Sequence, residues 1–231
     1  MDSKKILNTI IIPAWREEKG LPVVLSKVYQ IIDDTYEVIV VDDGSDDGTY
    51  RVASQFPCRF IRHEVNKGKG EALKTGISQA VGENIIWMDA DDSYPPELIP
   101  QVVEALSTYD MVVCSRKWGK ENIPLFNRLG NRIFRIMIKV IYGFKPDDPC
   151  SGLWGVKKSK LMIMRLSSKR FAIEPEIAMK GSRMKLKMLD IPIEYRERIG
   201  ETKLNGIKVG LEDLLAIIRH ITWRPERDYN G

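Results

Sequence analysis

Residues 36–43 read YEVIVVDD and residues 84–91 read NIIWMDAD, and these two stretches decide the fold. Each is a short apolar run that ends in acidic residues. Apolar runs without polar alternation are typical of strands that are buried on both faces of a parallel sheet. Ligands in such folds bind at the carboxyl ends of the strands. The sequence therefore predicts buried strands whose ends gather carboxylates at one edge.

Outward from these stretches, strand-like and helical segments alternate. Further strands are expected at Thr9–Pro13, Cys58–Arg62 and Met111–Cys114, and helices at Leu21–Ile31, Thr49–Gln55, Gly70–Ala80 and Pro96–Leu106. Strands that alternate with helices imply an α/β fold with a mostly parallel sheet and helices on both faces.

The regular alternation of strands and helices ends after residue 115. Helices are expected at Phe126–Tyr142, Glu176–Arg183 and Ile207–Trp223, and strands at Gly152–Val156 and Lys187–Ile193. The sequence contains no repeat, low-complexity segment or clear linker. We therefore expect a single domain over residues 1–231, with two functional halves, 1–115 and 116–231.

Composition limits the class of protein. The chain has 231 residues, 43% hydrophobic and 29% charged, which is typical of a soluble globular protein. A net charge of +4 is too small to indicate a nucleic-acid partner, so none is expected. Three cysteines without a CxxC pair favour a reducing cytoplasm, and no signal peptide or 18-residue apolar span is visible.

Basic residues are concentrated in one segment. Residues 116–145 contain eight Lys or Arg and only one acidic residue, Glu121. A local basic surface of this kind indicates an anionic partner such as a phosphate or phospholipid head groups.

The acidic pair Asp89 and Asp91 suggests a metal site. Two carboxylates at positions i and i+2 after a buried strand can turn toward one point, and Mg²⁺ usually takes one or two carboxylates together with substrate phosphates. Such a pair alone is also typical of a turn or helix cap. Here it accompanies Asp42 and Asp43 at the end of another strand, and the loop NKGKG at 66–70, whose glycines and lysines suit phosphate.

These segments together resemble glycosyltransferase family 2. The resemblance rests on IIPAWREE (11–18), VVDDGSDDGT (40–49), NKGKGEALKTGI (66–77) and MDADDSYPPEL (88–98). It implies the Rossmann-like GT-A fold and a nucleotide-sugar-binding first half. The nucleotide-sugar residues implied are Pro13, Trp15, Glu17, Asp42, Asp43 (on the base), Lys69, Asp89 and Ala90. The implied ligands of a Mg²⁺ or Mn²⁺ ion are Asp89, Asp91 and Ser93, where Ser93 replaces a glutamine of some relatives.

The second half resembles a narrower group, the dolichol-phosphate mannosyltransferases and related polyprenyl-phosphate glycosyltransferases. The similar segments are CSRK (114–117), FNRLGNRIF (126–134), DDPCSGLWGVKK (147–158), EPEIAMK (174–180) and IPIEYRERIGETKLNG (191–206). The resemblance implies inverting transfer of a hexose from a UDP- or GDP-sugar to a polyprenyl (dolichyl) phosphate. The acceptor-phosphate residues would be Arg116, Arg128, Ser151, Arg198 and Lys203, and the catalytic residues Asp91, Arg116, Arg198 and Lys203.

The nature of the acceptor decides whether a general base is needed. A phosphate monoester, with its second pKa near ~6, is mostly a dianion at neutral pH and is already a nucleophile. A hydroxyl acceptor would need a base, for which Glu174 and Glu176 are candidates, although both also fit as carboxylates at a helix N-terminus. Transfer to a soluble hydroxyl with Glu176 as base, and a non-catalytic nucleotide-sugar-binding subunit, therefore remain alternatives.

Two amphipathic helices are expected in the second half. Arg128, Arg132, Arg135 and Lys139 form a basic stripe on one helix, and Ile207, Leu211, Leu214, Leu215 and Ile218 form an apolar stripe on the other. Both patterns fit a membrane interface as well as ordinary packing. With no membrane span before Gly231, we expect peripheral association with the cytoplasmic face of a membrane, or dependence on a partner subunit. His63 and His220 lie in no motif and are expected to be structural or exposed.

Overall fold

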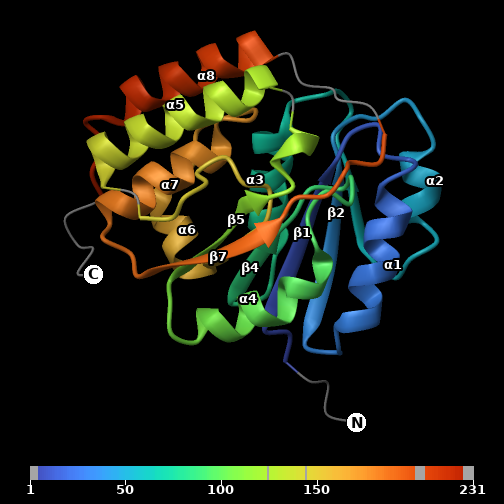
Figure 1. Cartoon of the computed structure of the whole chain (residues 1–231). Helices are drawn as coiled ribbons and strands as arrows, with labels where there is room; N and C mark the ends of the chain where they lie inside the picture. The colour runs from blue at the N-terminus through green and yellow to red at the C-terminus, as the bar shows by residue number, and fades with distance from the viewer. Residues whose placement is uncertain (1–4, 124, 144, 201–205, 226–231) are drawn as a thin grey trace.

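The computed structural model describes residues 5–123, 125–143, 145–200 and 206–225. Its centre is a seven-stranded sheet with the strand order β3-β2-β1-β4-β6-β5-β7. Helices cover both faces of this sheet (Figure 1). The arrangement confirms the expected α/β fold with a mostly parallel sheet.

The first half builds the parallel part of the sheet. β1 (Asn8–Ala14) lies between β2 (Tyr36–Asp42) and β4 (Asn84–Trp87), and β3 (Arg59–Arg62) extends the sheet beyond β2. All these pairs are parallel, so the strands end at one edge. The helices between them are α1 (Leu21–Ile31), α2 (Thr49–Ala53), α3 (Lys69–Gln79), η1 (Pro96–Leu98) and α4 (Ile99–Leu106).

One strand of the second half runs against the others. β6 (Trp154–Lys157) is antiparallel to both β4 and β5 (Met111–Trp118), while β7 (Met188–Glu194) is parallel to β5. Because β6 runs backwards, it begins at the edge where β4 and β5 end. The preceding loop, residues 147–153, is thereby brought to the edge that carries the acidic residues.

Two apolar cores lie on opposite faces of the sheet. One contains residues of α1 and α4, and the other contains residues of α3, α6 (Lys158–Met164), α7 (Ile173–Arg183) and the two long helices α5 (Leu125–Tyr142) and α8 (Gly206–His220). A short helix, η2 (Lys120–Asn122), precedes α5. α5 and α8 lie side by side over α7 (Figure 1). Tyr142 fixes the pair by donating a hydrogen bond to the Ile217 carbonyl at 2.6 Å.

Candidate active site

The aspartates after β4 are held by cations from other parts of the chain. Asp91 is 5% exposed, and its Oδ1 accepts hydrogen bonds from the backbone amide of Ser93 at 3.1 Å and from the Ser93 hydroxyl. Its Oδ2 lies 3.0 Å from Arg198 Nη2. Burial and the charge of Asp89 raise the pKa of Asp91, against the opposing effect of Arg198. The two carboxylates of this turn therefore act on each other electrostatically.

Lys69, at the start of α3, contacts the other aspartate. Its Nζ lies 2.6 Å from Asp89 Oδ1 and 2.5 Å from Glu174 Oε1, in the first turn of α7. Burial lowers the pKa of Lys69, but the two carboxylates outweigh it, so the pKa is raised. Burial raises the pKa of Glu174 in spite of Lys69. Gly152 packs against the same aspartate, since a Cβ there would lie 2.2 Å from Asp89 Oδ2.

The donor set of this turn fits a divalent metal that is also held by its substrate. Within the described residues, no group of three or more His, Cys, Asp or Glu side chains is arranged to hold a metal. The protein thus offers the carboxylates of Asp89 and Asp91, which suits a hard cation whose other ligands come from phosphate and water. Ser93 is fully buried and its hydroxyl donates to Asp91, so its own ligation of a metal stays a prediction.

Asp42 and Asp43, at the end of β2, both organise nearby loops. Asp42 Oδ1 accepts the Ser45 amide at 3.0 Å. Asp43 accepts the backbone amides of Lys67 and Gly68 at 2.9 and 2.6 Å, and its Oδ1 lies 2.7 Å from His63 Nδ1. The loop that precedes Lys69 is therefore anchored on Asp43, whose predicted contact with the base stays a prediction.

His63 is buried beside Asp43, a contact that sequence reasoning did not indicate. It is 7% exposed, and its Nε2 lies 3.0 Å from Thr75 Oγ1, while Nδ1 faces Asp43. Hydrogen bonds at both ring nitrogens hold the imidazole, which in turn fixes the rotamer of the Asp43 carboxylate. No motif surrounds His63, and only its place at the end of β3 could have indicated this contact.

The segment after β1 lies against the turn after β2. Arg16 has a positive φ of 56°, pairs with Asp46 through two bonds of 2.6 Å, and lies 4.9 Å over the Trp15 ring. Glu17 donates its amide to Thr49 Oγ1 at 2.8 Å, and its carboxylate lies 4.0 Å from Arg198. Pro13 is half-buried at the end of β1, and Ala90 is buried between the two aspartates. The nucleotide-sugar residues expected from the sequence thus gather along one edge.

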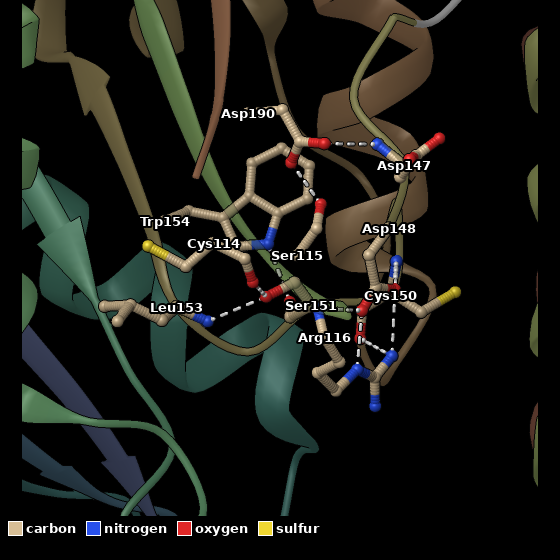
Figure 2. A network of polar contacts seen from close by, with 10 residues as sticks. All are labelled: Cys114, Ser115, Arg116, Asp147, Asp148, Cys150, Ser151, Leu153, Trp154 and Asp190. Atoms are coloured by element: carbon tan, nitrogen blue, oxygen red, sulfur yellow. Dashed lines mark hydrogen bonds and ion pairs between the residues drawn. The ribbon is translucent and has the colours of Figure 1, made fainter. Parts of the chain in front are cut away.

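Arg116 is held by Asp148 in the loop before β6 (Figure 2). The guanidinium makes two bonds to Asp148, of 2.5 and 2.9 Å, and donates to the Cys150 carbonyl at 2.9 Å. Burial by itself would raise the pKa of Asp148, but the charge and hydrogen bonds of Arg116 outweigh burial, so the pKa is lowered. The positive charge expected to bind an acceptor phosphate is therefore already neutralised, and that contact stays a prediction.

Ser151 lies deeper in the same network (Figure 2). It is fully buried, its hydroxyl donates to the Cys114 carbonyl at 2.5 Å, and its carbonyl accepts from Trp154 Nε1 at 2.6 Å. These bonds give Ser151 a role in shaping the loop, and its expected contact with an acceptor phosphate stays a prediction.

The other residues that the sequence predicts to bind the acceptor phosphate have different surroundings. The segment before residue 200 crosses the acidic turn at residues 89–93, because the Arg196 amide donates to the Ser93 carbonyl at 3.0 Å and the Ile199 amide to the Asp91 carbonyl at 2.8 Å. Arg128 donates to the carbonyls of Ile123 and Glu121 at 2.7 and 3.2 Å, and no described carboxylate pairs with it. Lys203 lies outside the described residues.

Glu176, the candidate base for a hydroxyl acceptor, is enclosed by hydrogen-bond donors. It is fully buried and accepts the amides of Ser167 and Ser168 at 2.9 and 2.7 Å. Lys180 Nζ lies 2.5 Å away and His220 Nε2 3.4 Å away, so His220 is structural as expected. Burial by itself would raise the pKa of Glu176, but the hydrogen bonds and the charge of Lys180 outweigh burial, so the pKa is lowered. A carboxylate enclosed in this way cannot take a proton from an acceptor in this conformation.

Comparison with known proteins shows which family and which relatives the chain resembles. The family model "Glycosyl transferase family 2" matches residues 9–162. The chain is 34% identical to a dolichol-phosphate mannosyltransferase of Pyrococcus furiosus, over 95% of this chain and 65% of that protein. It is 30% identical to a UDP-N-acetylglucosamine–dolichyl-phosphate N-acetylglucosaminyltransferase of Methanococcus voltae, over 87% and 92%.

A solved structure shares the fold. Glucosyl-3-phosphoglycerate synthase from Mycobacterium tuberculosis, in complex with Mn²⁺, UDP-glucose and phosphoglyceric acid, superposes with a TM-score of 0.76 at 19% identity, over 96% of this chain and 81% of that one. This likeness confirms the GT-A fold expected from the sequence. Fold, acidic turn and family match agree, and the chain belongs to glycosyltransferase family 2.

Proposed function

We propose that this glycosyltransferase moves a hexose from a nucleotide diphosphate sugar to a polyprenyl (dolichyl) phosphate, with inversion at the anomeric carbon. The observation that carries the proposal is the position of Arg198. Its Nη2 lies 3.0 Å from Asp91, and its Nε is buried with no hydrogen-bond partner among the described residues. An unpaired guanidinium donor beside the acidic turn suits a phosphate oxygen. The names of the relatives, which include mannosyl and N-acetylglucosaminyl transfer to dolichyl phosphate, support the same acceptor.

The donor side follows from the carboxylates at the end of β4. Asp89 and Asp91 would hold Mg²⁺ or Mn²⁺, which when bound neutralises charge on the departing diphosphate. Asp43, fixed by His63, would orient the base, and Trp15 would stack on it. The Mn²⁺ and UDP-glucose in the structure of the mycobacterial relative support both the metal and a UDP-sugar, while a GDP-sugar fits the same arrangement.

The acceptor side needs no general base. A phosphate oxygen attacks the anomeric carbon as the bond to the diphosphate oxygen breaks, so the centre inverts and no proton has to leave. Three buried or nearly buried carboxylates of the second half are already paired: Glu174 with Lys69, Asp148 with Arg116, and Glu176 with Lys180. Arg128, which lacks a described carboxylate partner, and Arg198 would bind the phosphate.

The outer helices suit the surface on which such an acceptor lies. Large apolar side chains are exposed along α5 and around the end of α8: Leu125, Leu129, Ile133, Ile136 and Val140 on α5, Leu215 and Ile218 on α8, and Ile221 just after it. No described helix is long and apolar enough to cross a membrane. Apolar stripes flanked by Arg132 and Lys139 fit peripheral binding to anionic phospholipid at the cytoplasmic face.

Vesicle sedimentation tests this surface. Ile136→Glu with Val140→Glu should abolish binding to anionic vesicles, because both side chains are exposed by half or more. Lys160→Glu, on α6, is the control for an added acidic charge on another surface. Equal binding by the apolar-surface variant and the unchanged protein would refute membrane association through α5 and α8.

A donor panel tests the reaction. UDP-glucose, UDP-N-acetylglucosamine and GDP-mannose are each incubated with Mn²⁺ and a short polyprenyl phosphate, and the lipid product is followed by mass. We expect a metal-dependent lipid phosphosugar from one donor, lost in Asp91→Asn. Metal-dependent donor hydrolysis without any lipid product would keep the nucleotide site and refute the acceptor, and transfer to a soluble sugar hydroxyl would favour the other family 2 reaction.

A further inference from the structure

Three charged side chains from distant parts of the chain meet beside the acidic turn. Lys69 begins α3, Asp89 follows β4, and Glu174 lies in the first turn of α7. The Lys69 ammonium lies 2.6 Å from Asp89 and 2.5 Å from Glu174. The side chain of Glu174 is 4% exposed, that of Lys69 is 14% exposed and that of Asp89 is 29% exposed. The cluster is thus one shared cation between two carboxylates, screened only weakly by water.

The mechanism proposed above does not use Glu174. Glu174 carries a buried charge in the second half of the chain, yet its ion-pair partner, Lys69, belongs to the first half. A buried carboxylate is costly unless it is paired, so Lys69 is needed to keep Glu174 ionised. The reverse also holds: the Lys69 ammonium, at 2.5 and 2.6 Å from its two partners, is attracted by Glu174 as well as by Asp89.

We propose that Glu174 is a positioning residue of the metal site, which holds the Lys69 ammonium and thereby leaves Asp89 with the charge it needs to ligate a divalent cation. This inference rests on the proposed metal site at Asp89 and Asp91. Without the carboxylate of Glu174, the ammonium would pair with Asp89 alone and compete with the metal for it. Glu174 also keeps Lys69 in place when a divalent cation repels it from Asp89.

The sign of each substitution follows from this competition. Glu174→Gln keeps the shape of the side chain but frees the ammonium for Asp89, so Mn²⁺ binding should weaken by about 10-fold, the size typical of residues that support metal ligands. Lys69→Met removes the competing cation, so Mn²⁺ binding should tighten. In the Lys69→Met background, Glu174→Gln should lose most of its effect because there is no ammonium to redirect.

The chain offers a matched control. Glu176 is a second buried glutamate on the same helix, and it pairs with Lys180 instead of Lys69. Glu176→Gln therefore makes the same chemical change in the same element, with a similar loss of a buried ion pair. It should leave Mn²⁺ affinity unchanged, which separates a specific effect on the metal site from a general effect on the stability of α7.

The measurement is titration of the metal alone, with free Mn²⁺ followed by its electron paramagnetic resonance signal. Binding that weakens in Asp91→Asn and in Glu174→Gln, and tightens in Lys69→Met, supports the inference. Weaker binding in Asp91→Asn with no change in Glu174→Gln overturns the inference but keeps the metal site. Weaker binding in Lys69→Met also overturns the inference, and this variant decides the question if Glu174→Gln fails to fold. Binding that is equal in the unchanged protein and Asp91→Asn refutes the metal site itself, and the inference with it.

Discussion

Removal of Arg116 should destabilise the protein strongly, because Arg116 and Asp148 form an ion pair with side-chain exposures of only 10% and 12%. Arg116→Ala would leave the Asp148 carboxylate buried without its cation and the Cys150 carbonyl without its donor. Loss of one partner of a buried pair costs about 3–5 kcal/mol. This is a large share of the about 5–15 kcal/mol that separates a typical folded domain from its unfolded state.

Urea denaturation measures this loss. Arg128→Ala is the control, since Arg128 bonds to two backbone carbonyls without leaving a buried carboxylate, and should cost about 1 kcal/mol. The double variant Arg116→Met with Asp148→Asn should recover much of the loss, because it leaves no buried charge. A loss below about 1 kcal/mol for Arg116→Ala would refute the assignment of this pair as a structural element of the loop.

The pH dependence gives a second readout of the same pair. In the unchanged protein the pKa of Asp148 is lowered, so the stabilisation is present above the unfolded value of about 4 and is lost only as the pH falls below it. Without Arg116, burial would instead raise the pKa of Asp148. The loss in free energy of unfolding caused by Arg116→Ala should therefore become smaller as the pH falls from 7 toward 5. A loss that stays constant over that range would contradict the explanation.

Three further predictions concern the neighbouring residues. His63→Gln, which loosens Asp43, should raise KM for the donor more than it lowers kcat in initial-rate assays; an equal KM would contradict its role. Gly152→Ala places a Cβ 2.2 Å from Asp89 Oδ2 and should weaken Mn²⁺ binding in titrations, and unchanged affinity would show that the carboxylate moves without cost. Glu176→Gln should lower the free energy of unfolding, measured by urea denaturation, by about 2–3 kcal/mol at pH 7. Because the pKa of Glu176 is lowered, this contribution is present above about pH 4 and fades below it; a difference independent of pH would contradict it.

Much of the fold could be predicted from local patterns. The apolar runs of β2 and β4 indicated buried strands, and the acidic residues after them marked the edge where the candidate site lies. The helix α6 was missed, and α7 starts at Ile173, three residues before the expected Glu176. α6 is only seven residues long, too short for a clear helical period.

The partners of the charged residues could not be predicted. The sequence placed Arg116 and Lys69 on phosphates, but the structure pairs them with Asp148 and Glu174. These partners are far away along the chain and belong to separate elements, so no local spacing indicates them. The same holds for His63, whose contact with Asp43 exists only because β2 and β3 end side by side.

The central claim is that the acceptor nucleophile is a phosphate oxygen that needs no base. It is tested most directly by comparing a polyprenyl phosphate with the polyprenol of the same chain length, with the active donor, Mn²⁺ and the unchanged protein. The account predicts a lipid phosphosugar from the phosphate and no product from the alcohol, because a phosphate oxygen is already a nucleophile, whereas a hydroxyl needs a base and Glu174, Asp148 and Glu176 are all held by cations. Transfer to the polyprenol at a comparable rate would contradict it.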